Sequence, residues 1–141
     1  MASKKLKLVL ERIAEQGIMS FNEGATKKQI KEFEKEAGLV LPAKYKEWLL
    51  LSDGGYFFIP AGVQMYGVAH KPCIDVKDDD RPNESYAAIG VLSTGDPILY
   101  KKGSEQISIY NHEAGAIEND EQYEDFYAFL EGLYELLGIG E

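Results

Sequence analysis

The stretch that decides the fold runs from Gly24 to Gly55 and reads GATKKQIKEFEKEAGLVLPAKYKEWLLLSDGG. Thr26, followed three residues later by Gln29, is the pattern of a capping box, which predicts that a helix begins after Thr26. Gly38 is expected to end this helix, because glycine readily adopts the left-handed conformation found there. Pro42 then suits the first turn of another helix. Two helices are therefore expected here, and the closing glycine pair ends the second.

Apolar side chains recur at helical spacing on one side of each of these two helices. In the second helix, Tyr45 and Trp48 lie about one turn apart, and aromatic residues at such positions are usually buried. The inward-facing residues expected from the pattern are Ile30, Phe33, Ala37, Tyr45, Trp48, Leu49 and Ser52.

Further elements are expected on both sides of this stretch. A helix over about residues 4–15 is predicted because its apolar residues share one side. Aromatic and β-branched runs separated by turn residues predict strands later in the chain. The strands are expected at residues 56–59, 63–68, 87–92, 98–101 and 107–111, with a polar loop over 71–85.

The chain is expected to finish with a helix that begins after Asn119, a favourable N-cap residue. Its apolar residues follow one another at helical spacing over more than three turns. They are Tyr123, Phe126, Tyr127, Leu130, Leu133, Tyr134 and Leu137. The order of elements predicts an α+β fold with N-terminal helices, a central mixed or antiparallel sheet of about four to six strands and a C-terminal helix. The length suits a single domain over residues 1–141.

Charge is unevenly distributed along the chain. Lys and Arg number 15 against 24 Asp and Glu, which gives a net charge of −9. Residues 1–48 carry ten basic and seven acidic side chains, whereas residues 49–141 carry five and seventeen. A nucleic-acid-binding protein normally presents a basic surface, so nucleic acid is not expected as a partner. An acidic field steers a basic partner instead.

A cytoplasmic location is expected from the cysteine content and the N-terminus. Cys73 is the one cysteine and cannot form an intramolecular disulfide, which suits a reducing compartment. The basic N-terminal stretch is followed by only three apolar residues, too few for a secretory signal. No apolar run approaches the roughly 18 residues of a membrane span, so no membrane association is expected.

Few residues have the pattern of a catalytic or metal site. His70 and Cys73 have the spacing of half a zinc site, but the second pair that structural zinc usually needs is missing. The acidic residues within 75–84 lack the spacing of an EF-hand and are expected to form a solvated loop. His112 and Glu113 have the chemistry of an acid–base pair, but a packing or turn role is favoured. We therefore expect no catalytic residue, no cofactor, no metal and no enzymatic activity.

The ordered set of short motifs resembles the SUKH superfamily, which contains SMI/KNR-type fungal regulators of cell-wall synthesis and bacterial toxin-immunity proteins. The opening motif lies within residues 24–55 and comprises a Gly-Ala-Thr corner, an acidic amphipathic helix, Leu-Pro, an aromatic pair and an Asp-Gly stop. Later segments resemble a strand, the meander and the final helix of the family. They are Met65-Tyr66-Gly67, Ile89-Gly90, Gly95-Asp96-Pro97-Ile98, Ile109–Glu113 and Phe126–Leu130. The resemblance covers roughly residues 20–135.

The resemblance implies a mixed sheet with helices packed on it and a non-catalytic, protein-binding role. In bacterial members this role is usually the neutralisation of a partner toxin, often a nuclease. An acidic surface suits such a partner, because it mimics the phosphate charge that a nuclease cleft attracts. The alternative that the resemblance implies is a regulatory scaffold that docks onto cellular enzymes.

The candidate partner-binding residues are exposed aromatic and acidic side chains. Alternate residues of the expected strand at 56–59 point outward, and exposed aromatic residues favour an interface. Acidic residues on the outer side of the last helix repel one another unless a basic partner neutralises them. The candidates are Tyr56, Phe58, Asp78, Asp79, Asp80, Glu124, Asp125, Glu131 and Glu135.

Overall fold

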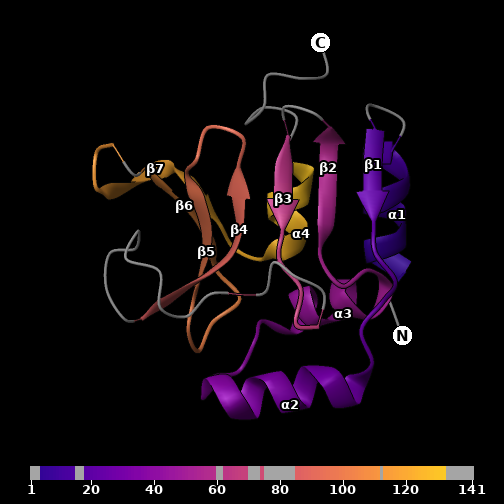
Figure 1. The fold of residues 1–141 in the computed structure, drawn as a ribbon. Helices are drawn as coiled ribbons and strands as arrows, with labels where there is room; N and C mark the ends of the chain where they lie inside the picture. Colours follow the sequence, from indigo (N-terminus) through magenta and orange to yellow (C-terminus); the bar gives the residue numbers. More distant parts are fainter. Residues whose placement is uncertain are drawn as a thin grey trace.

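The computed structural model describes residues 4–14, 18–59, 62–69, 74, 85–111 and 113–132 (Figure 1). Helices occur at both ends of this part of the chain and strands between them. In order, the elements are α1 (Lys4–Ala14), β1 (Ile18–Phe21), α2 (Lys27–Ala37), α3 (Ala43–Leu51), β2 (Gly55–Ile59), β3 (Val63–Met65), β4 (Tyr86–Leu92), β5 (Pro97–Lys101), β6 (Ile107–Asn111), β7 (Ala116–Tyr123) and α4 (Phe126–Glu131).

The strands form one sheet in the order β1-β2-β3-β4-β5-β6-β7, and each neighbouring pair is antiparallel. The predicted α+β class is therefore confirmed, with an antiparallel sheet. The predicted number of four to six strands is slightly too low, since the described residues alone form a sheet of seven. The two additional strands, β1 and β7, form the edges of the sheet, where the sequence pattern predicts no strand.

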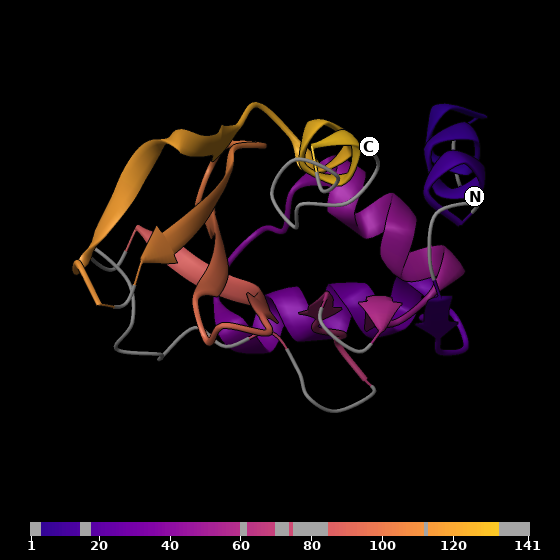
Figure 2. The ribbon, with the colours of Figure 1, turned by 90° about the horizontal axis from the view of Figure 1, so that it is seen from above.

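One face of the sheet is covered by helices. α1, α3 and α4 lie on the same side of β1–β3, and the strands from β4 to β7 curl toward that side (Figure 2). α4 contacts α1, α3 and β7, and so occupies the middle of the helical layer. α2 lies apart from this layer, across the lower end of the sheet in Figure 1. None of the described helices covers the opposite face of β1–β3, which we call the open face.

The indole of Trp48 lies at the centre of the core between helices and sheet. It packs against the rings of Tyr45, Phe57 and Phe126 at centroid distances of 5.6, 5.6 and 5.8 Å. The ring of Phe21 meets it edge-on at 6.2 Å. Trp48 and Tyr45 are fully buried, which confirms that this aromatic pair belongs to the core. One side chain of α3 thus connects β1 and β2 with α4.

The predicted capping box of α2 is present. The hydroxyl of Thr26 accepts a hydrogen bond from the Gln29 N–H at 3.1 Å, and the Gln29 side chain accepts one from the Thr26 N–H at 2.9 Å. Gly38 ends the helix with a φ of 71°. The preceding corner also requires glycine, because a Cβ on Gly24 would lie 2.0 Å from the carbonyl oxygen of Leu50. The Gly-Ala-Thr corner that precedes α2 therefore packs closely onto the end of α3.

Asp53 holds the segment that follows β3. Its buried carboxylate accepts hydrogen bonds from the N–H groups of Val68 at 2.7 Å and Ala69 at 2.9 Å. The hydroxyl of Tyr45 donates to the carbonyl of Tyr66 at 2.5 Å in the same segment. Burial raises the pKa of Tyr45 well above its ordinary value, and the negative charge of Asp53 adds to this effect. Asp53 therefore acts as a structural carboxylate.

The start of the last helix differs from the prediction. Asn119 was expected to cap this helix, but it lies inside β7, which pairs with β6 as far as Tyr123. The helix begins at Phe126, and Asp125 is its N-cap: the Asp125 carboxylate accepts a hydrogen bond from the N–H of Ala128 at 2.8 Å. Asn119 has suitable N-cap chemistry, but the pairing of β7 with β6 on either side of it overrides that local preference. Of the predicted apolar stripe, the residues from 133 onward lie outside the described part.

Most of the remaining predicted boundaries are close to the observed ones. The strands expected at 56–59, 87–92, 98–101 and 107–111 are found within about one residue. The strand expected over residues 63–68 is shorter, since β3 ends at Met65 and the following backbone turns to meet Asp53. Pro42 occupies the N-cap of α3 rather than its first turn. Most of the loop expected over 71–85 lies outside the described residues.

Candidate protein-binding surface

A row of four side chains crosses the open face of the sheet. Strand pairing places Ser20 of β1 opposite Tyr56 of β2, Tyr56 opposite Gln64 of β3, and Gln64 opposite Val91 of β4. Successive residues of a strand point to opposite faces. Phe57 packs into the core on the helical side, so Tyr56 and its row lie on the open face. We call Ser20, Tyr56, Gln64 and Val91 the open-face row.

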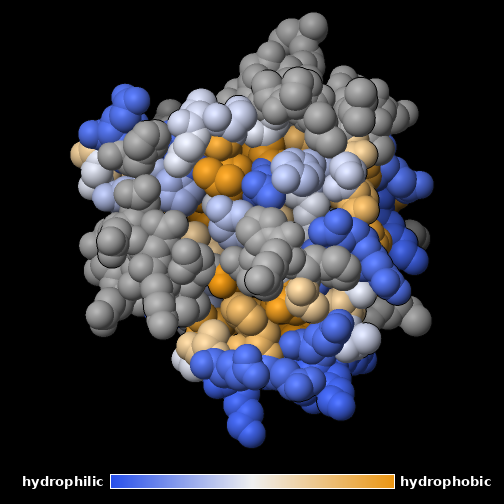
Figure 3. All heavy atoms as spheres, in the orientation of Figure 1, coloured by the Kyte–Doolittle hydropathy of each residue, from blue (hydrophilic) through white to orange (hydrophobic). Residues whose placement is uncertain are grey.

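The open-face row borders a groove with a volume of about 460 Å³. Its lining residues are Ser20, Tyr56, Phe57, Gly62, Val63, Gln64, Val91, Leu92 and Ser93, and none of them carries a charge. Tyr56 is 46% exposed, an unusual degree for a large aromatic side chain in a sheet. Figure 3 views this face and shows hydrophobic side chains at the surface among hydrophilic ones. The groove thus offers apolar and neutral polar surface in a strongly charged protein.

A hydrogen bond joins the two central residues of the row. The side-chain amide of Gln64 donates to the hydroxyl oxygen of Tyr56 at 2.9 Å. The phenol keeps its own proton for donation, and the Gln64 carbonyl oxygen keeps its lone pairs. Within the described part of the chain, neither of these two groups has a further hydrogen bond. The Tyr56 hydroxyl thus presents a donor and the Gln64 side-chain carbonyl an acceptor. A backbone peptide group, with its own C=O and N–H, could bind to both.

Of the predicted acidic residues, Glu124, Asp125 and Glu131 are among the described ones, and none of the three lines the groove beside Tyr56. Glu124 is exposed and borders a separate hollow of about 320 Å³, next to Glu105, Gln106 and Gln122. This hollow lies where the turn between β5 and β6 meets the end of β7. Among the described candidates, Glu124 thus lies on a surface separate from the one that carries Tyr56.

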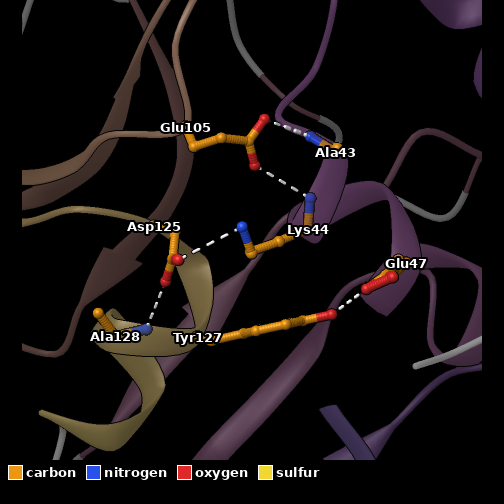
Figure 4. Close-up of polar contacts among 7 residues, drawn as sticks. All are labelled: Ala43, Lys44, Glu47, Glu105, Asp125, Tyr127 and Ala128. Carbon is orange, nitrogen blue, oxygen red and sulfur yellow. Dashed lines mark hydrogen bonds and ion pairs between the residues drawn. The ribbon is translucent and has the colours of Figure 1, made fainter. Parts of the chain in front are cut away.

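Two of the predicted acidic residues also have partners within the domain. The carboxylate of Asp125 faces the Lys44 ammonium at 3.5 Å in addition to capping α4 (Figure 4). Glu131 lies 3.8 Å from the Arg12 guanidinium on α1, and both of these side chains are largely exposed. The repulsion expected along the outer side of the last helix does not involve Asp125 as a helical residue, since the helix begins at Phe126. Asp125 is thus mainly structural, whereas Glu124 and Glu131 remain accessible.

The other predicted residues cannot be placed in this surface. Phe58 belongs to β2, but the position of its side chain lies outside the described part. The acidic residues Asp78, Asp79, Asp80 and Glu135 also lie outside it, as do His70, Cys73 and His112. Glu113 lies in the turn before β7, where its N–H donates to the Asn111 side chain at 3.0 Å. A turn role is thus observed for this residue.

Among the described residues, no group of three His, Cys, Asp or Glu side chains is placed to hold a metal ion. Within the same part of the chain, no helix is both long and apolar enough to cross a membrane.

Comparison with known proteins bears directly on these observations. The model of the SMI1/KNR4 family (SUKH-1) matches residues 24–132. The chain belongs to this family. The match begins at the Gly24 corner and extends through α4, so it confirms the predicted resemblance and includes Tyr56, Gln64 and Val91 of the open-face row. SMI1/KNR4 and other SUKH members are generally non-catalytic immunity or regulatory domains. No curated protein matches the chain.

Proposed function

We propose that this SMI1/KNR4 family member is a single, non-catalytic protein-binding domain over residues 1–141 that neutralises a partner toxin. The observation that carries the proposal is the uncharged groove along the open-face row, with Tyr56 exposed at its centre. The partner would bind across β1–β4, where none of the described helices is in the way.

The composition of the groove favours a protein partner over a reaction centre. Interface cores are depleted of charged residues and enriched in aromatic ones, and tyrosine is common among the residues that dominate binding energy. A catalytic site would instead bring together titratable or nucleophilic groups. The groove is lined by serine, glutamine, tyrosine and apolar residues, which bind but supply no general acid or base near neutral pH.

The charge of the chain supports a basic partner. Seventeen acidic against five basic side chains in residues 49–141 generate a field that accelerates the approach of a positively charged protein. A nuclease toxin is an example, since its phosphate-binding cleft is basic. In this account Glu124 and Glu131, together with Asp78, Asp79, Asp80 and Glu135, guide the partner, and the open-face row holds it. Neutralisation would occur in the cytoplasm, where Cys73 stays reduced.

A regulatory scaffold is the second candidate, and membership of the SMI1/KNR4 family favours it equally. A scaffold would use the same groove to dock onto a cellular enzyme. The two functions differ in what the partner does when a cell makes it without this chain. A toxin then stops growth, whereas a cellular enzyme does not.

The test compares the wild-type chain with Tyr56→Arg, which puts a charge into the groove. Leu8→Arg on α1 is the matched control, because Leu8 is also an exposed large hydrophobic residue, 52% exposed. A protein captured from the source cell by the wild type and by Leu8→Arg, but not by Tyr56→Arg, is the partner. Expressed alone it should stop growth of a host, and co-expression of the wild type should restore growth. A captured partner that is harmless alone would favour the scaffold, and capture by all three forms would contradict the groove.

A further inference from the structure

α2 carries basic side chains on one side of the helix. Lys27, Lys31 and Lys35 follow one another at i, i+4 and i+8, and Lys28 lies beside them, so all four share one side of the helix. All four are exposed. Figure 3 shows hydrophilic side chains gathered at the lower end of the molecule, where α2 lies. We call these four residues the lysine face.

The lysine face forms no ion pair with the described part of the chain. The nearby lysines of α3 do have partners: Lys44 lies 3.5 Å from Asp125, and Lys46 lies 3.2 Å from Glu34. Within the described residues, no acidic side chain forms such an ion pair with any member of the lysine face. Like charges spaced by four residues on a helix repel one another. Among the described residues, the lysines of α3 are therefore paired, whereas the four neighbouring lysines of α2 are not.

Burial fixes the direction of this face. Ile30 is buried, and Phe33 and Ala37 are half-buried on the side of α2 that meets the rest of the domain. The lysine face lies away from that side, whereas Glu32 and Glu36 occupy the flank farther round the helix. All of these acidic and basic side chains reach solvent.

We propose that the lysine face of α2 is a second binding surface, whose partner is an acidic segment of another protein. Its three in-line lysines span about 12 Å, with about 6 Å between successive charges, as α-helical geometry requires. An acidic helix with carboxylates at i, i+4 and i+8 has the same spacing and the opposite charge. Charge complementarity therefore selects an acidic helix as the partner.

Nucleic acid fits this surface less well than an acidic helix. Double-stranded DNA carries a charge for about every 1.7 Å of its axis, so it would extend far beyond four lysines. Beyond them it would meet Glu32 and Glu36 on the flank, and a protein of net charge −9. A short acidic segment needs only the lysine face itself. This surface is separate from the open-face groove, and the proposal does not depend on the function proposed for that groove.

The experiment uses the full chain and two capped helical peptides. One peptide carries glutamates at i, i+4 and i+8, and the other carries glutamines at those positions. Backbone amide chemical shifts of the isotope-labelled chain are followed at low and at physiological salt. The variant is Lys31→Glu with Lys35→Glu, and the control is Lys7→Glu with Lys102→Glu, two exposed lysines off this helix. Both double variants change the net charge from −9 to −13, so the overall field is matched.

The proposal predicts shifts confined to α2 with the glutamate peptide and none with the glutamine peptide. The α2 double variant should bind at least tenfold more weakly than the wild type, and the control less than threefold more weakly. Equal losses in both variants would overturn the proposal, because they would reflect net charge alone. The proposal would also be overturned if a ten-nucleotide oligothymidylate shifted the same amides and bound more tightly than the glutamate peptide. Self-association of the wild-type chain, measured by sedimentation and lost in the α2 double variant, would overturn it as well.

Discussion

The side-chain carboxylate of Glu105 caps the helix that begins at Ala43. Its two oxygens accept hydrogen bonds from the N–H of Ala43 at 2.7 Å and from the N–H of Lys44 at 3.1 Å (Figure 4). Pro42 occupies the N-cap position of α3 and has no side chain that could accept these bonds. A residue in the turn between β5 and β6 thus supplies the cap of a helix about sixty residues earlier in the chain. The contact anchors α3, which carries Trp48, to the far half of the sheet.

Removal of this cap should destabilise the domain. Glu105→Ala leaves two backbone N–H groups without their acceptor and removes a negative charge from the positive end of the helix, so we expect a loss of about 1–2 kcal/mol in the free energy of unfolding. Urea melts monitored by circular dichroism measure this loss. Glu113→Ala removes the same charge from an exposed turn and is expected to change stability by less than about 0.5 kcal/mol. Equal effects of the two substitutions would show that the cap contributes nothing.

The buried indole at the centre of the core should be among the most sensitive positions. Trp48→Ala is expected to lower the free energy of unfolding by about 3–5 kcal/mol, because it leaves a cavity between α3, β2 and α4. Val40→Ala is the comparison, since Val40 is 67% exposed and should change little. A loss under about 1 kcal/mol for Trp48→Ala in a denaturant melt would contradict the packing of this core.

Tyr100 should make stability depend on alkaline pH. Burial raises the pKa of its hydroxyl above the ordinary value, with a smaller contribution from Glu34. The pKa of Tyr100 is thus higher in the folded than in the unfolded chain. The neutral Tyr100 hydroxyl therefore contributes stability that is fully present below about pH 10 and is lost as the pH rises toward the folded pKa. The hydroxyl also has no hydrogen-bond partner among the described residues. Tyr100→Phe should therefore be as stable as wild type at pH 7, or more so.

Urea melts at pH 7 and at about pH 10.5 test this prediction, with the variant losing less stability between the two values than the wild type. Tyr45 acts in the same direction and remains in both proteins, so some alkaline loss should persist. A drop of more than about 1 kcal/mol for Tyr100→Phe at pH 7 would indicate that the hydroxyl makes a favourable hydrogen bond.

The acidic residues Glu131 and Glu135 should affect how fast the partner binds. Glu131→Lys with Glu135→Lys is expected to leave folding intact, slow association and flatten its salt dependence, because the steering field weakens. Glu23→Lys with Glu113→Lys is the control with the same change in net charge, and both of its residues are exposed. Association rates at low salt that are equal for wild type and the first variant would show that the partner does not approach this face.

The sequence predicted correctly those features that depend on residues close together in the chain. The capping box of Thr26 and Gln29 lies within four residues, and its geometry is as predicted. The inward side of α3 was also correct, since helical spacing alone places Tyr45 and Trp48 together. The start of the last helix was wrong because Asn119 lies within β7, a strand held by pairing of both its ends with β6, which the local capping signal does not reveal.

The candidate site was only partly predictable for the same reason. Tyr56 stood out as an aromatic residue on an outward position of a strand, but Ser20 and Gln64 carry no individual signal. They meet Tyr56 because β1, β2 and β3 pair, and β1 is a four-residue edge strand without a strong strand pattern. The alternation in Val63-Gln64-Met65 is the one local hint, since it places Gln64 on the face opposite two buried residues.

The most direct test of the central claim is site-specific photo-crosslinking from the open face. Tyr56→p-benzoylphenylalanine is compared with Leu8→p-benzoylphenylalanine on α1, each bound to the partner identified by capture. We expect the adduct with the partner from position 56 to be at least ten times more abundant than the adduct from position 8. An adduct from position 8 but not from position 56, with the partner still bound to both forms, would contradict the claim that the open-face groove binds the partner.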